Sequence, residues 1–453
     1  MEVKNKATKI DLFSLATPQM RTFHMTWFAF FLCFFGWFGI APLMALVRED
    51  LMLTKAQIGN TIIASVAITV IVRIIIGPLC DRFGSRLVYT WLLLLGSLPV
   101  MGIGLAQSYE SFLLFRLAIG AIGASFVITQ YHTSMMFGPN CVGTANATTA
   151  GWGNLGGGVT QMVMPLILGA ILFFGVSESL GWRLAMVIPG AVLFVTGIGY
   201  YFCTQDAPDG NYTELRARGE LPPAEGSSKA SFWLAAKDYR VWALFVIYAA
   251  CFGVELTINN IAALYFYDFF KLDLATAGII AGLFGLMNIF ARTLGGVFSD
   301  ICAVKIGLRG RVWFMGAVLL AEGIALVVFS QMSVLPLAIM SMIVFSLFVQ
   351  MSEGATYAVV PFVNRKALGG VAGIVGAGGN AGAVAAGFLF RSENISTQQG
   401  LLILGCAVVL ASACMFLVTF PQAVQEEEQR NLEKALAEKA APAGEDLAPV
   451  VAS

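Results

Sequence analysis

Twelve apolar stretches follow one another along this chain of 453 residues, each of about twenty residues or more, the length at which a helix crosses the hydrocarbon core of a bilayer. Only helices and closed barrels satisfy their backbone polar groups in lipid, so this pattern predicts a bundle of twelve transmembrane helices. The expected spans lie at about residues 24–47, 57–79, 87–107, 110–137, 144–174, 184–204, 241–268, 274–299, 311–331, 335–360, 367–390 and 399–420.

The composition supports the same class of protein. Hydrophobic residues make up 58% of the chain and charged residues 12%, with a mean hydropathy of +0.79, whereas an average soluble domain has about 25% charged residues. A net charge of zero excludes a broadly basic surface for nucleic acid. The eight cysteines form no CxxC pair. We therefore expect no disulfide framework, no metal site and no cofactor.

A hydrophilic interruption divides the chain into two halves. Residues 205–239 contain prolines, glycines, serines and mixed charges, and are predicted to form a cytoplasmic linker. It separates a six-helix bundle at 24–204 from a second one at 240–420. The polar segment 1–23 precedes the first span, which lacks a cleavage site and is expected to be a retained helix. Residues 421–453 begin with an acidic run, expected to form a short solvated helix, and end in an Ala/Pro tail expected to be disordered.

The charges in the loops predict the orientation of the bundle. With the N-terminus in the cytoplasm, 19 of the 27 Lys and Arg residues fall in inside segments and 5 outside, while Arg73, Arg116 and Arg292 lie within spans. Cytoplasmic loops carry an excess of Lys and Arg. We therefore expect a multi-pass protein of the cell (inner or plasma) membrane with both termini in the cytoplasm.

One of the apolar runs is interrupted by an arginine. Arg73 is followed by Gly77 and Asp81 at i+4 and i+8, on one face of a helix. The same arrangement returns in the second half, in the stretch Arg292–Asp300. Because burying an arginine in a bilayer costs about 2.5–3.5 kcal/mol on insertion scales, such residues usually face a water-filled path or an anionic partner. Two equivalent arginines therefore predict an anion site between the halves.

Further matches show that the halves repeat in parallel. Gly153-Asn-Leu-Gly156 in the fifth span matches Gly379-Asn-Ala-Gly382 in the eleventh, six helices later. Gln130 in the fourth span matches Gln350 in the tenth, at the same spacing of six helices. Parallel repeats with a site at the midplane between them are typical of transporters that rock one bundle against the other.

Several motifs resemble those of a known family. The loop Gly77–Arg86 is similar to the G-x3-D-R-x-G-x-R loop of the major facilitator superfamily. The stretch Ala150–Gly158 resembles the helix-five signature of the nitrate/nitrite porter family within that superfamily, and so do Phe252–Thr257 and Glu353–Tyr357. The resemblance covers about residues 24–420. It implies an all-α membrane protein with twelve transmembrane helices in two parallel six-helix repeats, the major facilitator fold.

The resemblance also implies a binding site. Arg73 and Arg292 would grip the anion from opposite halves, Phe126 and Phe252 would flank it, and the Tyr248 hydroxyl would donate a hydrogen bond. One departure concerns Thr149, where some relatives have an asparagine, which leaves the role of that position open.

The chemistry of these residue types fits the same ligand. Nitrate and nitrite are planar, monovalent and weakly hydrated, and a planar guanidinium meets two of their oxygens at once. Aromatic walls favour such an ion over sulfate or phosphate. The alternative for the arginines is structural pairing with Glu255 or Glu353 in the membrane. For Phe126 and Phe252 the alternative is packing in the core or against lipid.

The glycine-rich helices have two interpretations. Gly153 and Gly378 each begin a small-xxx-small pair, which lets helices approach closely. The pairs serve either static packing or sliding of helices five and eleven as the site switches sides. Asn154 and Asn380 either bind the substrate or bridge helices, and we favour bridging.

Other polar residues are candidates for gating or coupling. Arg116 lies near the outer end of helix four and is expected to be a gate or pairing residue. Asp81, Arg82 and Arg86 on the inner loop are expected to latch the halves rather than to contact the substrate. Three carboxyls lie within spans, Glu255, Glu322 and Glu353. Of these, Glu255 is the favoured coupling residue, since it follows Phe252 and Tyr248 on one helix, although a structural partnership with an arginine is the alternative.

The sequence thus predicts a secondary transporter of nitrate, and of nitrite as well, that works by alternating access. It is not expected to be an enzyme, because no Walker loop, nucleophile elbow or long soluble segment is present. The alternatives are a facilitator of another small anion, such as a carboxylate, and a membrane sensor. Proton symport and nitrate/nitrite exchange both stay open, with symport favoured, and so does the physiological direction. The expected partners are the anion, protons and the lipid bilayer, and a monomer is expected.

Overall fold

The computed structural model describes residues 5–138, 141–220, 228–364 and 367–430. Over these ranges the chain is helical apart from connections, turns and two isolated β-bridges, Ala7 with Phe137 and Ala207 with Gly210. Twelve helical spans in the described ranges are long and apolar enough to cross a membrane. The predicted all-α bundle is therefore confirmed, and each expected span falls on one of these twelve.

Two crossings of the first half are interrupted near their middle or end by short 3-10 turns, and the others are continuous. The crossings are built from α1 (Pro18–Phe38) with α2 (Met44–Asp50), α3 (Lys55–Phe83), α4 (Ser85–Gly102), α5 (Tyr109–Gly120) with α6 (Ser125–Met136), α7 (Val142–Phe173) and α8 (Glu178–Cys203).

The second half repeats this order, with one crossing again broken by a 3-10 turn. Its crossings are α11 (Tyr239–Phe270), α12 (Leu274–Leu286) with α13 (Ala291–Ile306), α14 (Leu308–Ser330), α15 (Leu335–Val359), α16 (Leu368–Arg391) and α17 (Thr397–Ser412).

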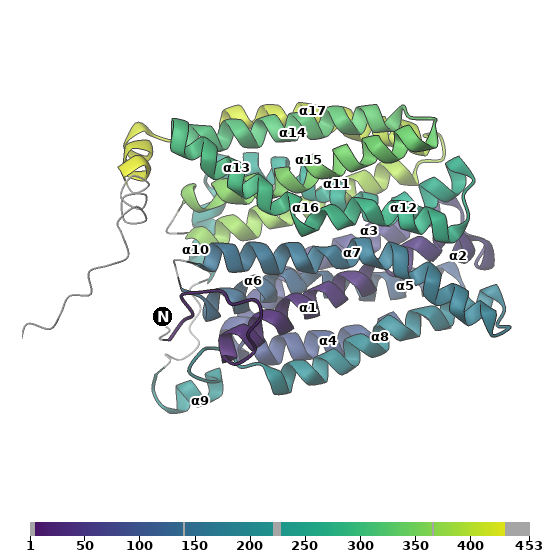
Figure 1. The fold of residues 1–453 in the computed structure, drawn as a ribbon, viewed down its shortest axis with the longest axis horizontal. Helices are drawn as coiled ribbons and strands as arrows, with labels where there is room; N and C mark the ends of the chain where they lie inside the picture. The colour runs from purple at the N-terminus through teal and green to yellow at the C-terminus, as the bar shows by residue number, and fades with distance from the viewer. Residues whose placement is uncertain (1–4, 139–140, 221–227, 365–366, 431–453) are drawn as a thin grey trace, which may run out of the picture.

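The two halves lie side by side, and their contacts follow the repeat (Figure 1). Across the junction α3 packs on α16, and α12 packs on α7, which is the same contact with the halves exchanged. Within each half α1 packs on α7 and α11 on α16. Glycines allow the closest approach, since a Cβ on Gly158 of α7 would come within 2.7 Å of the Gly285 backbone on α12. Sequence repetition is thus matched by repeated packing.

The N-terminal segment, the linker helices and the end of the described chain gather at one end of the bundle, while α2 lies at the other (Figure 1). The linker is more structured than its composition indicates, because it contains α9 (Tyr212–Ala217) and α10 (Ser228–Ala236). Residues 422–430 are helical, as expected for the acidic run. The Ala/Pro tail lies outside the described residues. These two ends are called the α9 end and the α2 end below.

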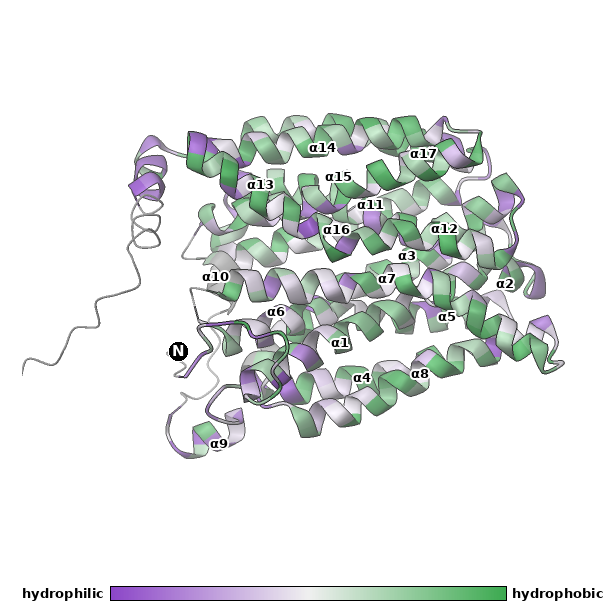
Figure 2. Ribbon diagram, in the orientation of Figure 1, coloured by the Kyte–Doolittle hydropathy of each residue, from purple (hydrophilic) through white to green (hydrophobic). Residues whose placement is uncertain are grey.

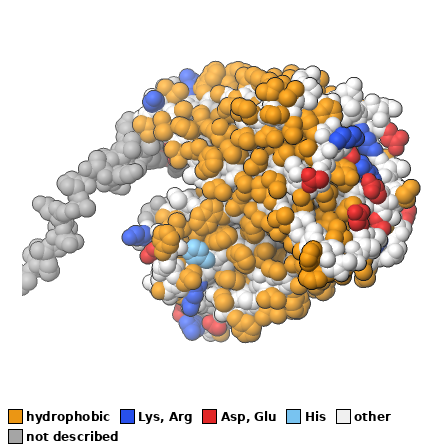
Figure 3. Space-filling view, turned by 45° about the vertical axis from the view of Figure 1, so that its right-hand side comes forward, with side chains coloured by type: hydrophobic (Ala, Val, Ile, Leu, Met, Phe, Trp, Pro, Cys, Tyr) orange, Lys and Arg blue, Asp and Glu red, His pale blue; other side chains and the backbone are white. Residues whose placement is uncertain are grey.

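The outer surface of the bundle is apolar over the length of the helices (Figure 2). In the space-filling view hydrophobic side chains cover the middle of the molecule, and charged side chains gather toward its two ends (Figure 3). Many large hydrophobic side chains are exposed there, such as Ile74, Phe202 and Leu410 at 71%, 78% and 75%. In water such a surface would be unfavourable, and it fits the hydrocarbon core of a bilayer.

Candidate functional site

Arg73 lies two-thirds of the way along α3, a helix that begins with a capping box formed by Thr54 and Gln57. Its guanidinium donates to two backbone carbonyls, Nη1 to Gly376 of α16 and Nη2 to Gly123, each at 3.3 Å. Its Cζ lies 5.5 Å from the centre of the Phe126 ring. These contacts leave the side chain partly accessible and involve no carboxylate. Arg73 thus brings a positive charge to the junction of the halves.

Arg292 lies in the first turn of α13, just after the 3-10 break in its crossing. Its Nη1 is 2.6 Å from Oε2 of Glu353 on α15, and its Nη2 donates to the Tyr248 hydroxyl at 3.1 Å. Both charged side chains are buried, with exposures of 8% and 0%. The pairing that the sequence left open, between an arginine and an intramembrane carboxylate, is therefore formed by Arg292.

A set of aromatic side chains lies between the two arginines. Phe252 stacks on Tyr248, with ring centres 5.3 Å apart. The Tyr357 ring meets Tyr248 edge-on at 5.0 Å and Phe126 at 6.4 Å. Tyr248 and Tyr357 both interact electrostatically with Arg73. The candidate residues Arg73, Phe126, Tyr248, Phe252 and Arg292 thus converge on one region.

Tyr357 was not singled out by sequence reasoning, although it belongs to this set. It follows Glu353 by one helical turn, at i+4 on α15, and it sits inside a stretch that carries the family resemblance. That spacing was the available signal, because it places both side chains on one face of the helix.

Asn154 and Asn380 occupy matching helices but different surroundings. Asn154 of α7 donates to Oε2 of Glu255 at 3.4 Å, and so connects α7 to α11 across the halves. The other Glu255 oxygen accepts from Asn288 at 2.8 Å. Asn380 of α16 is fully buried. Among the described residues, the bridging role expected of the asparagines is formed at Asn154.

The glycines of α7 and α16 lie against different kinds of atoms. A Cβ at Gly153 would overlap the Phe30 ring of α1, whereas a Cβ at Gly378 would overlap the backbone carbonyl of Phe245 on α11. The first overlap is with a side chain, and the second is with the backbone of a helix. Thr149, also on α7, donates its hydroxyl hydrogen to the backbone carbonyls of Ala145 and Asn146, at 3.0 and 3.1 Å.

The loop between α3 and α4 contacts α8 and the linker. The Arg86 guanidinium lies 4.2 Å from the Tyr201 ring centre, and the Arg82 carbonyl accepts from Arg216 of α9. Gly84 has φ +86°, and a side chain there would strike Asp206. These contacts stay within the first half and the linker, and the Asp81 side chain lies outside the described ones.

Asp206 organises this loop from the linker side. Its carboxylate accepts from the backbone N–H groups of Arg86 and Tyr212, at 2.8 and 3.0 Å, and so caps the start of α4. Burial raises the pKa of the Asp206 carboxyl, and these hydrogen bonds oppose that shift. The loop is thereby tied to the linker that joins the halves.

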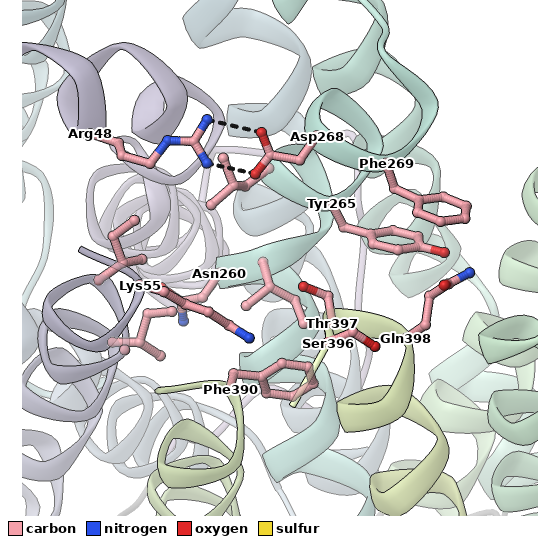
Figure 4. A pocket seen from close by; sticks show the side chains of 15 residues that line it. Arg48, Lys55, Asn260, Tyr265, Asp268, Phe269, Phe390, Ser396, Thr397 and Gln398 are labelled. Atoms are coloured by element: carbon pink, nitrogen blue, oxygen red, sulfur yellow. Dashed lines mark hydrogen bonds and ion pairs between the residues drawn. The ribbon is translucent and has the colours of Figure 1, made fainter. Parts of the chain in front are cut away.

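Polar contacts join the halves toward the α2 end. Arg116, fully buried on α5, donates to Asn260 of α11 at 2.9 Å and to Ser65 at 3.1 Å. Nearby, Arg48 forms two hydrogen bonds to Asp268, at 2.6 and 2.9 Å. Figure 4 shows this ion pair among the side chains that line a hollow, which has a volume of about 430 Å³. The contacts of Arg116 and Arg48 join the first half to the second toward the α2 end.

The described residues contain no group of three or more His, Cys, Asp and Glu side chains that could hold a metal ion. His132 instead bonds to the Tyr200 hydroxyl at 2.6 Å and to the Gln205 carbonyl at 2.8 Å. The eight cysteines are free thiols.

Comparison with known proteins now identifies the chain. The sequence model of the Major Facilitator Superfamily matches residues 26–363. High affinity nitrate transporter 2.5 of Arabidopsis thaliana is 42% identical, over 93% of this chain and 84% of the relative. The chain belongs to the nitrate transporter family of the Major Facilitator Superfamily. Nitrate transporter 2.1 of Chlamydomonas reinhardtii is 36% identical over 93% of this chain and 78% of its own length.

Other members and solved structures extend the likeness. The nitrate/nitrite transporter NrtP of Picosynechococcus sp. is 32% identical over 81% of this facilitator and 84% of its own length. The proton:xylose symporter XylE superposes with a TM-score of 0.68 at 15% identity, covering 92% of this chain and 99% of its own. A bacterial homologue of the lysosomal transporter Spinster reaches 0.67 at 16% identity, covering 87% and 96%. The two solved structures share the fold of this chain. The chain is a member of a family of transporters and not an enzyme.

Proposed function

We propose that the protein is a secondary active transporter that moves nitrate, and nitrite as well, across the membrane by alternating access. Its relatives named for nitrate or for nitrate and nitrite include plant, algal and cyanobacterial proteins. The anion binds between the halves, held by Arg73 and Arg292.

One observation carries this proposal. Arg73 reaches the junction of the halves with carbonyls and an aromatic ring as its contacts, and no carboxylate among the described side chains forms an ion pair with it. A positive charge within a membrane-spanning helix without a counter-ion is unfavourable, and a monovalent anion relieves it. The guanidinium fork suits the planar ion, and the rings of Phe126, Tyr357 and Phe252 surround it with surface that excludes water.

The charges predict the orientation of the bundle in the membrane. The N-terminus, the linker and the end of the described chain share one end of the bundle, and the expected inside segments carry most of the Lys and Arg. We place this end in the cytoplasm of a cell carrying the transporter in its plasma or inner membrane. The α2 end then faces outward, and the contacts of Arg48 and Arg116 close it.

Uptake of an anion needs an energy source. A negative-inside potential opposes a monovalent anion by about 2.3 kcal/mol per 100 mV. Co-transport of protons or exchange for nitrite supplies the drive, and we favour protons, because carboxyls lie beside the anion site. A monomer suffices, since each chain contains both arginines.

The experiment is transport of labelled nitrate into vesicles that contain the purified protein. Saturable uptake, competed by nitrite and not by small carboxylates, is expected. Uptake of a carboxylate without nitrate would instead establish a facilitator of another anion, and no transport of either would remove the proposal. Protein-free vesicles and the Arg73→Lys variant serve as controls.

A further inference from the structure

Glu353 pairs with the Arg292 guanidinium, which the anion also needs. The Glu353 carboxylate lies 2.6 Å from Nη1 of Arg292, and the second Nη of that arginine donates to Tyr248. A nitrate that meets Arg292 with two oxygens uses both Nη groups. Nitrate and Glu353 therefore compete for one guanidinium.

The surroundings of Glu353 hold no substitute for Arg292 among the described groups. The side chains that face it are Arg292 from α13, Glu255, Tyr248 and Cys251 from α11, Glu322 from α14, and Tyr357 from its own helix. The α12 segment, which also packs on α15, contains no titratable residue. Arg292 is the one cation in this set, and two of its other members are carboxyls.

A displaced Glu353 carboxylate would therefore be left charged and unpaired. It is fully buried, and an isolated carboxylate in an apolar interior is strongly unfavourable, so such groups take up a proton instead. Replacement of Glu353 by the anion at Arg292, together with protonation of Glu353, leaves the net charge of the site unchanged. Before it, Arg292 is balanced by the Glu353 carboxylate, and after it by the anion, while the carboxyl holds the proton.

We propose that Glu353 is the proton-binding group of the transport cycle, protonated when the anion occupies Arg292 and ionised when the anion has left. This inference rests on the proposed function. It explains how binding of an anion brings a proton with it. The anion takes Arg292 away from Glu353, and a proton on Glu353 leaves Arg292 free for the anion. Release runs in reverse, as Glu353 loses its proton and takes Arg292 back.

Glu255 is less suited to this role, although its position on α11 made it the favoured candidate from sequence. Its two oxygens accept from the amides of Asn154 and Asn288, so it does not depend on Arg292 for its hydrogen bonds. A glutamine there keeps one of the two accepting oxygens, and its amide nitrogen can donate to the second asparagine once that amide turns to present its oxygen. Glu255 is therefore a positioning residue that joins α7 to α11.

Glu322 provides a matched control. It is a fully buried carboxyl on α14, beside Ser352, and is not bonded to Arg292. Glu322→Gln makes the same chemical change as Glu353→Gln on a neighbouring helix.

The first test uses vesicles with a pH dye inside and the membrane potential clamped. Nitrate added outside should acidify the lumen with the parent protein, with Glu322→Gln and with Glu255→Gln. Glu353→Gln should lose the acidification while keeping exchange of labelled for unlabelled nitrate. Acidification by Glu353→Gln at the parental ratio of protons to nitrate would overturn the proposal, and so would its loss in Glu255→Gln alone.

The second test does not depend on a variant that folds. Calorimetric titration of the parent protein with nitrate in two buffers of different ionisation enthalpy gives the protons taken up on binding. Between the pH at which Glu353 ionises in the empty site and the higher pH at which it ionises beside the bound anion, about one proton per nitrate is expected, with apparent affinity falling about tenfold per pH unit. Nitrate binding without proton uptake at any pH would overturn the role of Glu353 and leave the proposed function intact. Absence of nitrate binding and transport would instead remove the proposed function.

Discussion

The two halves carry an arginine at equivalent positions but hold it differently. Arg73 contacts carbonyls and the Phe126 ring, while Arg292 pairs with a carboxylate and a tyrosine. In the repeat that matches Gln130 with Gln350, the residue equivalent to Glu353 is the neutral Thr133. A repeated helix therefore does not imply a repeated role. The first half offers an open cation, and the second a cation with a built-in competitor.

Replacing either arginine by lysine should have the largest effect on nitrate binding and uptake, and it compares the two halves directly. Lysine keeps the charge but loses the fork, which removes about 1.5–3 kcal/mol of charge-assisted hydrogen bonding, or roughly ten- to 150-fold in affinity. Arg73→Lys should abolish detectable uptake of nitrate, and proton movement driven by nitrate should be lost with it. Arg292→Lys should weaken binding while keeping a cation beside Glu353.

The measurements are nitrate binding to purified protein and uptake in vesicles, with thermal unfolding to confirm that both variants fold. Near-normal affinity in both variants would remove the arginines from the site.

Enlarging the glycines of α7 and α16 should have the next largest effect. Gly153→Val and Gly378→Val overpack the helices, at a cost of about 1–3 kcal/mol. Gly378→Val should be the more damaging, because a Cβ there meets the Phe245 carbonyl of a helix backbone, whereas a Cβ at Gly153 meets the side chain of Phe30. Uptake is compared at equal amounts of inserted protein.

Matched controls lie on the same two helices. Gly169 of α7 and Gly373 of α16 have no atom within 4 Å of an added Cβ, so their valine variants should transport normally. Full transport by an inserted Gly153→Val protein would mean that close approach is not required there.

Removing the aromatic partner of each arginine should have a smaller effect. Phe126→Leu removes a cation–π contact worth about 0.5–2 kcal/mol from Arg73. Tyr248→Phe removes a hydrogen bond worth about 0.5–1.5 kcal/mol from Arg292. Nitrate affinity should fall by roughly two- to thirtyfold, measured at several pH values.

The pH profile separates the halves. Tyr248→Phe should alter the pH dependence of binding, because it changes the surroundings of the Arg292–Glu353 pair, while Phe126→Leu should lower affinity by the same factor at every pH. Equal shifts in both profiles would contradict the division of roles.

Weakening the Arg48–Asp268 pair should have the smallest effect. Asp268→Asn removes a half-exposed ion pair between the halves, worth about 0.2–1 kcal/mol, so the outward-open population should rise by no more than about fivefold. A cysteine placed at Ser396, in the hollow, should react faster with an impermeant thiol reagent. Asp273→Asn, which alters a cap within α12, is the control and should not change this rate. An unchanged rate in Asp268→Asn would show that this pair does not hold the α2 end closed.

Much of the architecture was predictable from the sequence, because its cause is local. An apolar run of membrane length forms a helix wherever it stands in the chain, and the twelve runs needed no knowledge of their neighbours. Arg73 and Arg292 were conspicuous for the same reason, since an arginine in an apolar run is unfavourable whatever packs beside it. The repeat was visible as motifs at matching places in the two halves.

The pairing of charges was decided by the tertiary structure alone. Glu255 and Glu353 were equal candidates for an arginine partner, and only the packing of α15 against α13 brings Glu353 to 2.6 Å from Arg292. Glu255 meets amides from two other elements instead. An ion pair needs contact at a few ångströms between side chains of different helices, and that depends on the rotation and depth of each helix in the bundle, which no spacing within one helix encodes.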